Sequence, residues 1–328
     1  MEHIALGTSG RQTTRLGFGC GNIMGVIGRR NSLKLLESAF DSGIRHFDVA
    51  PRYGYGEAES CLGEFLQRHS GQVTVTTKYG ILPPKNISLI TVGRRVAGPL
   101  IQRMPGLKKR VAQVAKAATR NDERPTFTAA QARASLDKSL AHLRTSHIDL
   151  WLLHEVEAAD LHDDTLLHLM EDLVQQGIIG SFGIGSGADK IPALLAEHPA
   201  FCRTLQYEWS ILDPPIPDSP ASPFRIHHRA FTHQFHSLHH ALTRNKPLCQ
   251  RWSTDANIDL SESGTLARLM LKAALVMNPS SIILFSSKNP RHIQANALAA
   301  ADSSLDLPAR QLYRLIQTER DQLSFHPI

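Results

Sequence analysis

Four side chains with acid–base chemistry stand at or just beyond the ends of short apolar or β-branched stretches. Asp48 and Tyr53 lie in HFDVAPRYGYGEAESCLG (46–63), Lys78 follows VTVTT, and His154 ends IDLWLLH. A buried ammonium needs a carboxylate partner, and Asp48 is the candidate for Lys78. An ammonium beside a phenol lowers its pKa from about 10, so we expect Lys78 to lower the pKa of Tyr53. With His154 holding a substrate oxygen, the set would form a general acid aimed at a carbonyl, which suits hydride transfer.

Each of these residues also has a simpler interpretation when it is taken alone. An aspartate at the end of a strand often caps a helix, a single lysine is usually solvated, and a single histidine usually has an ordinary hydrogen-bond partner. The functional interpretation therefore depends on a fold that brings all four side chains to one place.

Alternating strand and helix patterns along the whole chain predict such a fold. Short apolar stretches predict strands over 15–21, 44–50, 73–80, 148–154, 180–186, 202–209, 224–232 and 281–287. Helical spacing of apolar residues predicts helices over 32–43, 58–69, 128–143, 164–177, 188–199, 264–279 and 290–300. Eight such units indicate an α/β fold, the TIM (β/α)8 barrel, whose active site lies at the carboxyl ends of the strands.

A doubly wound dinucleotide-binding sheet would alternate in the same way. GIGSGA (183–188) matches the glycine pattern of that fold after a strand. It lies past the middle of the chain, and no acidic residue stands cleanly at the end of the next strand. Because single matches of this kind are weak, we favour the barrel.

The length of 328 residues fits one large α/β barrel or two ordinary domains, and the repeat that runs through the whole chain without an obvious linker favours one. We expect residues 1–328 to form a single TIM-barrel domain, with a basic insert at about 81–126 between the third and fourth strands. The insert forms either part of the substrate pocket wall or a lid, or it is a structural addition that contacts only the flank of the barrel. The chain carries a net charge of +6, but the stretch 94–120, which holds much of that charge, has no aromatic residue to stack on a base. We therefore do not expect nucleic-acid binding.

Other features of the sequence indicate a cytoplasmic protein. We expect no signal peptide and no membrane segment, because the start lacks a basic-then-apolar pattern and no run of about 18 apolar residues occurs. The four cysteines are scattered, which is typical of reduced thiols. The histidine-rich stretch 233–240 is interpreted as a solvated helix face, so no metal site is expected.

The motifs taken together resemble the aldo-keto reductase family. HFDVAPRYGYGEAESCLG, TTKYG, HIDLWLLHE, GIIGSFGIGS, LQYEWS and SSKNPRHIQANA occur in the order that the family shows. APRYGYGEAE is similar to the branch that includes bacterial sugar 1-dehydrogenases. The resemblance implies a TIM-barrel oxidoreductase that transfers a hydride between NAD(P)H and a carbonyl or sugar substrate without a metal. It makes Tyr53 the proton donor, Asp48 and Lys78 its tuning pair, and His154 the residue that orients the carbonyl.

The resemblance also implies a cofactor site, with NADP(H) expected rather than NAD(H). Gln206 would bond the nicotinamide carboxamide, and a helix beginning near Asn289 would add its dipole. The remaining positions implied for cofactor contacts are Gly185, Ser186, Ser287, Lys288, Arg291 and Asn296.

Several positions depart from the family pattern. Gly185 and Ser186 replace a usual Ser-Asn pair, and His292 and Ala295 replace a frequent arginine and acid. An aromatic residue that stacks on the nicotinamide is not evident, and 227–229 offer two histidines and an arginine in its place. These departures raise an alternative function, a nicotinamide-binding sensor or regulatory subunit without catalysis.

Overall fold

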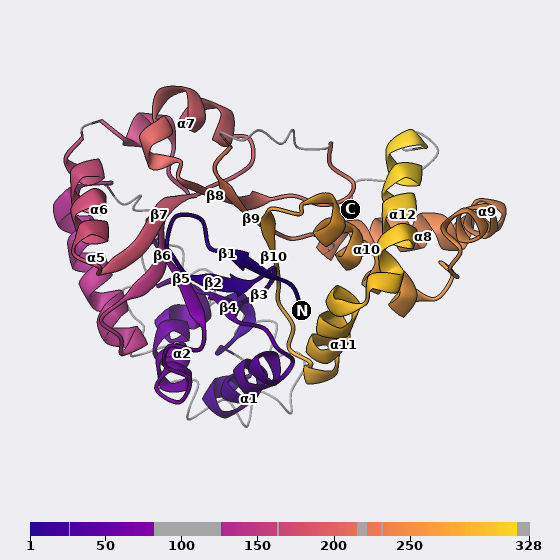
Figure 1. Cartoon of the computed structure of the whole chain (residues 1–328), viewed down its shortest axis with the longest axis horizontal. Coiled ribbons are helices and arrows are strands. Elements are labelled where there is room, and N and C mark those ends of the chain that lie inside the picture. The colour runs from indigo at the N-terminus through magenta and orange to yellow at the C-terminus, as the bar shows by residue number, and fades with distance from the viewer. Residues whose placement is uncertain (26, 82–125, 163, 215–221, 231, 320–328) are drawn as a thin grey trace, which may run out of the picture.

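The computed structural model describes residues 1–25, 27–81, 126–162, 164–214, 222–230 and 232–319, and its centre is a closed parallel barrel (Figure 1). The strands follow one another around the barrel in the order β10-β3-β4-β5-β6-β7-β8-β9. Their bounds are β3 (Leu16–Gly19), β4 (His46–Asp48), β5 (Thr74–Tyr79), β6 (Ile148–His154), β7 (Ile179–Gly185), β8 (Thr204–Glu208), β9 (Phe224–His228) and β10 (Ser281–Phe285). The predicted (β/α)8 barrel is therefore confirmed.

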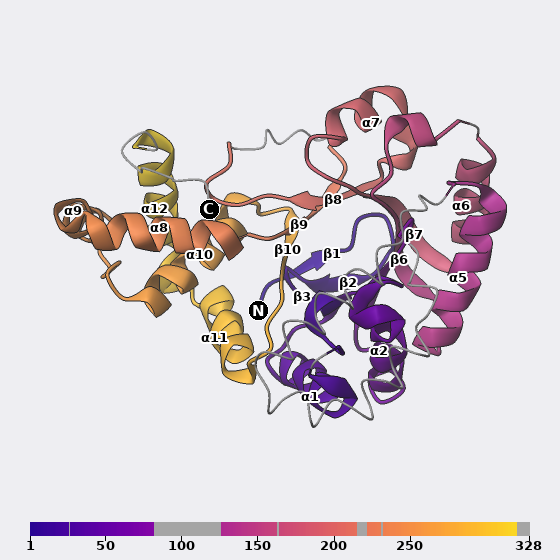
Figure 2. The same ribbon diagram turned by 180° about the vertical axis from the view of Figure 1, so that it is seen from behind.

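Helices surround this barrel, as the views from the two sides show (Figures 1 and 2). Those following the first five barrel strands, within the described residues, are α1 (Gly28–Asp41), α2 (Ala58–Leu66), α5 (Ala129–Leu143), α6 (Thr165–Gln175) and α7 (Ile191–Glu197). The later ones are α8 (Thr232–Arg244), α9 (Lys246–Ala256), α10 (Ser263–Met277), α11 (Pro290–Ala301) and α12 (Asp306–Thr318). Thr128 caps α5, because its side chain accepts a hydrogen bond from the amide of Gln131.

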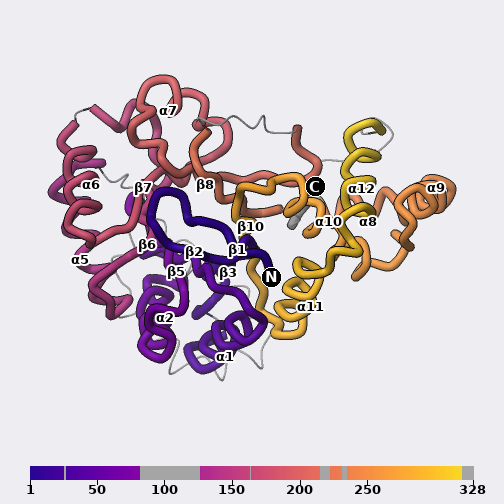
Figure 3. The backbone as a smooth tube through the Cα atoms, viewed as in Figure 1, coloured from indigo at the N-terminus to yellow at the C-terminus, as the bar shows by residue number. Residues whose placement is uncertain are grey.

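A hairpin of β1 (His3–Ala5) and β2 (Gln12–Thr14) lies across one end of the barrel (Figure 3). Leu6, in its turn, packs into a buried cluster with Leu150, Leu152, Ile226, Ile282 and Leu284 from the barrel strands. The hairpin therefore covers the amino-terminal end of the barrel, and the opposite end remains for chemistry.

The run IDLWLLH illustrates why the barrel strands are continuously apolar. Leu150 and Leu152 join the inner cluster, whereas Trp151 and Leu153 belong to the outer core that the helices cover. Because side chains alternate between the two faces of a strand, His154 continues the inner row at the carboxyl end of β6.

Some elements differ from the sequence expectation. The hairpin β1–β2 and the helices α9 and α12 were not predicted, and the strand expected over 224–232 ends at His228. The insert expected at 81–126 falls outside the described residues except at its two ends. In the described part of the chain, no helix combines the length and the apolar character needed to span a membrane.

A buried carboxylate ties α2 to the barrel and to α5. Glu59 accepts a hydrogen bond from Thr77 at 2.7 Å, and its other oxygen lies 3.5 Å from Nδ1 of His142. The hydrogen bond with Glu59 raises the pKa of His142, although burial opposes it. The protonated imidazole thus binds the carboxylate of Glu59, a residue that is only 2% exposed.

We expect this pair to make the stability of the protein pH-dependent. A raised pKa in the folded state gives stabilisation that is complete below the unfolded value of 6.5 and is lost as pH rises through the folded value. Because the His142 side chain is 52% exposed, the change should be below about 1 kcal/mol. Urea unfolding of wild type and His142→Asn over this pH range measures it. An equal pH slope in both proteins would contradict the assignment.

Candidate active site

An ion pair between neighbouring strands occupies the carboxyl end of the barrel. Nζ of Lys78 lies 2.6 Å from Oδ1 of Asp48 and donates a second hydrogen bond, of 3.1 Å, to the carbonyl of Val49. Both side chains are almost fully buried. The other oxygen of Asp48 accepts a 2.8 Å hydrogen bond from the Gln206 amide, which reaches it from β8. Asp48 therefore joins residues of β5 and β8 at the centre of the rim.

The phenol of Tyr53 lies beside this ion pair. Tyr53 begins a 3-10 turn over Tyr53–Gly56, immediately before α2. The ammonium of Lys78 lies 5.3 Å from the centroid of the Tyr53 ring. This arrangement brings together the acid, the amine and the phenol that the sequence placed on separate segments.

His154 completes the group from the next strand. Its ring centroid is 6.4 Å from that of Tyr53, and the two rings are nearly perpendicular. Burial, and then the charge of Lys78, hold the pKa of His154 well below 6.5, so the imidazole is neutral at neutral pH. Within the described residues its buried Nδ1 has no hydrogen-bond partner. Because Nδ1 is buried, a ligand would meet Nε2, and a neutral imidazole protonated at Nε2 donates one N–H to it.

Lys78 acts on the pKa of Tyr53 in the expected direction, but the net shift has the opposite sign. Lys78 exerts the largest single influence and lowers the pKa of Tyr53, as expected. Burial, the carboxylate of Asp48 and the nearby Cys20 raise it, and their sum prevails, so the pKa lies above 10.0. Burial of the phenol is the largest of the effects that raise its pKa, and the charge of Asp48 adds to it. The sequence argument considered only the ammonium of Lys78 and left out burial, Asp48 and Cys20, all of which raise the pKa of Tyr53.

Burial also keeps the nearest thiol inert. Cys20 follows β3 at the same rim and is fully buried, and its burial raises the thiol pKa well above 9.0. A thiol that stays protonated is a poor nucleophile. The four cysteines are all free and buried in the structure.

β9 settles which of the residues 227–229 faces the site. Ile226 belongs to the inner cluster, so the alternation of side chains directs His228 to the same inner side at the strand end. His228 responds to the charges of Asp48 and Lys78, and burial is the main cause that lowers its pKa to about 4. His227 instead packs against the rings of Tyr207 and Trp209.

The residues predicted at the nicotinamide end lie on adjacent strands. Gly185 ends β7 and pairs with Gln206 on β8. A Cβ atom on Gly185 would lie 3.4 Å from Oε1 of Gln206, so the glycine leaves the amide open on that side. Ser186 is buried, and its hydroxyl donates to the carbonyl of Val156 at 2.8 Å. These three residues surround the end of the Asp48 network.

The residues predicted at the phosphate end follow β10. Asn289 caps α11 by accepting a 3.0 Å hydrogen bond from the amide of Arg291. Ser287 bonds the backbone of Asn289, whereas Lys288 is exposed and Asn296 lies on α11, half-buried. The structure assigns Lys288 and Arg291 no ion-pair partner among the described residues, so two cations flank a helix amino terminus.

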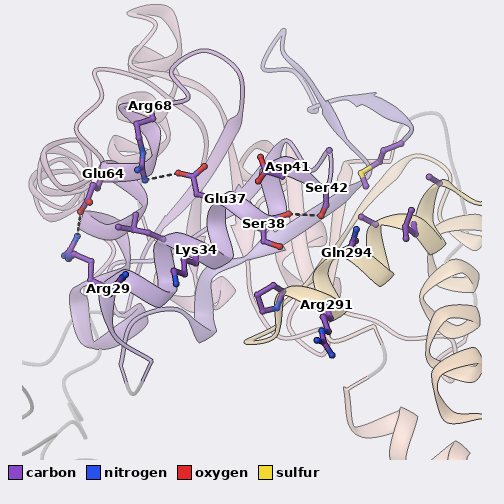
Figure 4. Close-up of a pocket in the computed structure, with 18 residues that line it drawn as sticks. Arg29, Lys34, Glu37, Ser38, Asp41, Ser42, Glu64, Arg68, Arg291 and Gln294 are labelled. Atoms are coloured by element: carbon purple, nitrogen blue, oxygen red, sulfur yellow. Dashed lines mark hydrogen bonds and ion pairs between the residues drawn. The ribbon is translucent and has the colours of Figure 1, made fainter. Parts of the chain in front are cut away.

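A surface groove separates α1 from α11 at the flank of the barrel (Figure 4). Its volume is about 1120 Å³, and Arg291 and Gln294 line it from α11. On the wall opposite α11, Arg29 forms an ion pair with Glu64 at 3.3 Å, and Arg68 forms one with Glu37 at 2.9 Å. Asp48, Tyr53, Lys78 and His154 do not line this groove, so the catalytic candidates form a separate site.

Comparison with known proteins gives concordant matches. The model of the aldo/keto reductase family matches residues 15–224. D-threo-aldose 1-dehydrogenase of a Pseudomonas species is 32% identical over 198 residues, which cover 56% of this chain and 53% of that protein. Pyridoxal 4-dehydrogenase of Microbacterium luteolum is 39% identical over 101 residues, 26% of this chain and 30% of that protein. The chain thus spans about half, or less, of the length of these curated relatives.

A solved structure shares the fold over nearly the whole chain. The aldo-keto reductase of Klebsiella pneumoniae in complex with NADPH superposes with a TM-score of 0.60 and covers 95% of this chain and 96% of its own. The sequence identity is 16%, so this likeness concerns the fold. The resemblance inferred from the motifs is confirmed.

We expect the ion pair to dominate the stability of the site. Lys78→Met would leave the buried Asp48 without its cation, at a cost of about 3–5 kcal/mol in the free energy of unfolding. Asp48→Asn combined with Lys78→Met should recover much of that loss, because no uncompensated charge remains. Urea unfolding of the two single variants and the double variant measures the coupling, with the exposed Lys34→Met as control. Additive effects would contradict the pairing.

Proposed function

Because the chain belongs to the aldo/keto reductase family, we propose that it is an NAD(P)(H)-dependent oxidoreductase that interconverts a carbonyl compound and its alcohol. The observation that carries the proposal is the buried Lys78–Asp48 ion pair, with Tyr53 and His154 beside it at the barrel rim. The match to residues 15–224 supports it, because that segment contains all four residues.

Tyr53 is the proposed proton donor to the carbonyl oxygen. Its raised pKa keeps the phenol protonated across the neutral range, as a general acid requires. Once the proton leaves, the ammonium of Lys78 stabilises the phenolate, since its own pKa is raised by Asp48 despite the opposing effect of burial. In the oxidation of an alcohol the same groups act in reverse, and the phenolate takes the proton.

His154 is the proposed orienting residue. A neutral imidazole donates one N–H to the carbonyl oxygen without competing with Tyr53 for the proton. Burial favours this neutral form, and the lysine charge adds to it. The substrate oxygen would therefore receive two hydrogen bonds, one from the phenol and one from the imidazole.

The residues present fit a nicotinamide dinucleotide. Two cations at the start of α11, Lys288 and Arg291, can bind phosphate groups, and the Gln206 amide can bind a carboxamide beside Gly185 and Ser186. Ser287 and Asn296 are the proposed polar contacts near the adenosine. When bound, the cofactor supplies or accepts the hydride. We propose NADP(H) as the cofactor, because a 2′-phosphate gains from these cations.

The proposed substrates are small carbonyl compounds or sugars. The names of the two curated relatives, an aldose 1-dehydrogenase and a pyridoxal 4-dehydrogenase, support this class. We also propose a cytoplasmic protein, which its four free, buried cysteines support.

Fluorescence titration with NADPH and NADH in parallel tests the cofactor proposal. We expect tighter binding of NADPH, and Arg291→Ala should reduce the ratio of the two affinities at least about tenfold by removing a charge-assisted hydrogen bond. Arg310→Ala, on α12, is the control. Binding of neither cofactor would refute the proposal. Binding of NADPH without turnover on any carbonyl would instead favour the sensor alternative.

Tyr53→Phe tests the assignment of the acid. Loss of the hydroxyl should reduce kcat by about 10²–10⁴-fold while cofactor affinity changes little, because the ring remains. Tyr313→Phe on α12 removes a hydroxyl that has no hydrogen-bond partner among the described residues, so it serves as the matched control. Steady-state kinetics on a panel of aldehydes and aldoses gives the readout. Unchanged turnover in Tyr53→Phe would exclude the phenol as the acid.

A further inference from the structure

Two loops at the catalytic rim contain an unusual backbone conformation in the same arrangement. Met24 and Gly25, between β3 and α1, both have left-handed φ angles, of 61° and 57°. Gly54 and Tyr55, between β4 and α2, also have left-handed φ angles, of 58° and 61°. Two of these four residues are not glycine, so they adopt a conformation that costs energy and persists only where neighbouring groups impose it.

The two pairs interlock through their glycines. A Cβ atom placed on Gly54 would lie 2.6 Å from Cβ of Met24 and 3.0 Å from the carbonyl oxygen of Ile23. A Cβ atom on Gly25 would lie 3.5 Å from Cε2 of Tyr55. The glycine of each pair thus faces the side chain of the other, and at Gly54 the approach is too close for any side chain.

The β3–α1 loop is anchored where it meets Gly54. The amide of Met24 donates a 2.7 Å hydrogen bond to Oγ of Ser32, which in turn donates to the carbonyl of Gly28 at 2.7 Å. Met24 is 5% exposed and belongs to the main core cluster. Met24 is therefore a fixed surface against which the chain at Gly54 rests.

Tyr53 lies directly before this contact. The same loop also approaches its ring, since a Cβ atom on Gly21 would lie 3.9 Å from both Cε2 and Cζ of Tyr53. On another side the ring faces the ammonium of Lys78, 5.3 Å from its centroid. The position of the phenol is consequently bounded by the barrel ion pair and by the β3–α1 loop.

We propose that the interlock of Met24-Gly25 with Gly54-Tyr55 positions Tyr53 for proton transfer, with Met24 and Gly54 as positioning residues. This inference rests on the proposed function, because it assigns a role within the same site. A shift of about 1 Å in a catalytic group can cost about 100-fold in rate, so a contact that holds the residue after Tyr53 has a measurable effect on turnover.

Gly54→Ala is the test, and Gly71→Ala is its matched control. Gly71 also has a left-handed φ, of 73°, but no atom lies within 4 Å of its added Cβ. Both variants therefore place alanine at a left-handed φ angle, with the same kind of conformational strain. Only in Gly54→Ala does the new Cβ atom clash with Met24. We expect kcat to fall at least about 30-fold in Gly54→Ala and less than about 3-fold in Gly71→Ala, with cofactor affinity retained in both. Equal kcat values, at comparable melting temperatures, would overturn the proposal.

A rescue variant separates positioning from general damage. Met24→Gly removes the Cβ and Cγ atoms, 2.6 and 3.3 Å from the new Cβ, and leaves the Ile23 carbonyl oxygen at 3.0 Å. The relief is therefore partial, and Met24→Gly/Gly54→Ala should recover at least about threefold in kcat over Gly54→Ala. The interlock would be contradicted if the double variant had no higher kcat than Gly54→Ala, or if its kcat fell further by the factor that Met24→Gly alone causes.

A readout that needs no turnover distinguishes this inference from the proposed function. The phenol pKa of Tyr53, measured by ultraviolet titration as the difference from Tyr53→Phe, should change in Gly54→Ala and not in Gly71→Ala. If the wild type proves inactive with both cofactors and the phenol pKa still responds in this way, the interlock stands and the oxidoreductase proposal fails. An unchanged phenol pKa together with unchanged kcat would refute the interlock.

Discussion

The contact on which the site depends is the 2.6 Å ion pair of Lys78 with Asp48 inside the barrel mouth. Two isolated charges at this depth would lose several kcal/mol of hydration each, and only close pairing with further hydrogen bonds offsets that loss. The Val49 carbonyl and the Gln206 amide provide those bonds, to the ammonium and to the carboxylate respectively. Residues of three barrel strands, β4, β5 and β8, thereby meet in one buried network whose charged groups are hydrogen-bonded.

The same network determines the protonation of its neighbours. Lys78 remains charged because Asp48 compensates its burial, and that charge helps to keep His154 neutral. Lys78 lowers the pKa of Tyr53, but burial of the phenol, together with the charge of Asp48 and the nearby Cys20, outweighs the lysine and raises it. In the proposed reaction, the protonated phenol and the neutral imidazole would donate two hydrogen bonds to one oxygen, and the ammonium would stabilise the phenolate that remains after proton transfer.

The barrel provides these positions by a simple repeat. Parallel strands alternate inward and outward, so the rows that hold Leu152 and Ile226 inside also place His154 and His228 at the rim. The strands do not position Tyr53, because it lies in the 3-10 turn after β4. Its place depends on how the β4–α2 turn packs against the β3–α1 loop, and the left-handed residues Met24 and Tyr55 lie at that contact.

The sequence alone was sufficient for the barrel, its eight strands and the rim positions of Asp48, Lys78 and His154. Local periodicity carries this information, because a strand buried on both faces has a continuous apolar run and its last polar residue marks the rim. The hairpin was missed because His3–Ala5 and Gln12–Thr14 are too short to show a period. Only the tertiary structure decided the sign of the Tyr53 pKa shift, the inward direction of His228 and the packing of Gly54 on Met24. Electrostatic effects sum over all neighbours in space, and close contacts between loops depend on backbone geometry, so neither is written in the spacing of residues along the chain.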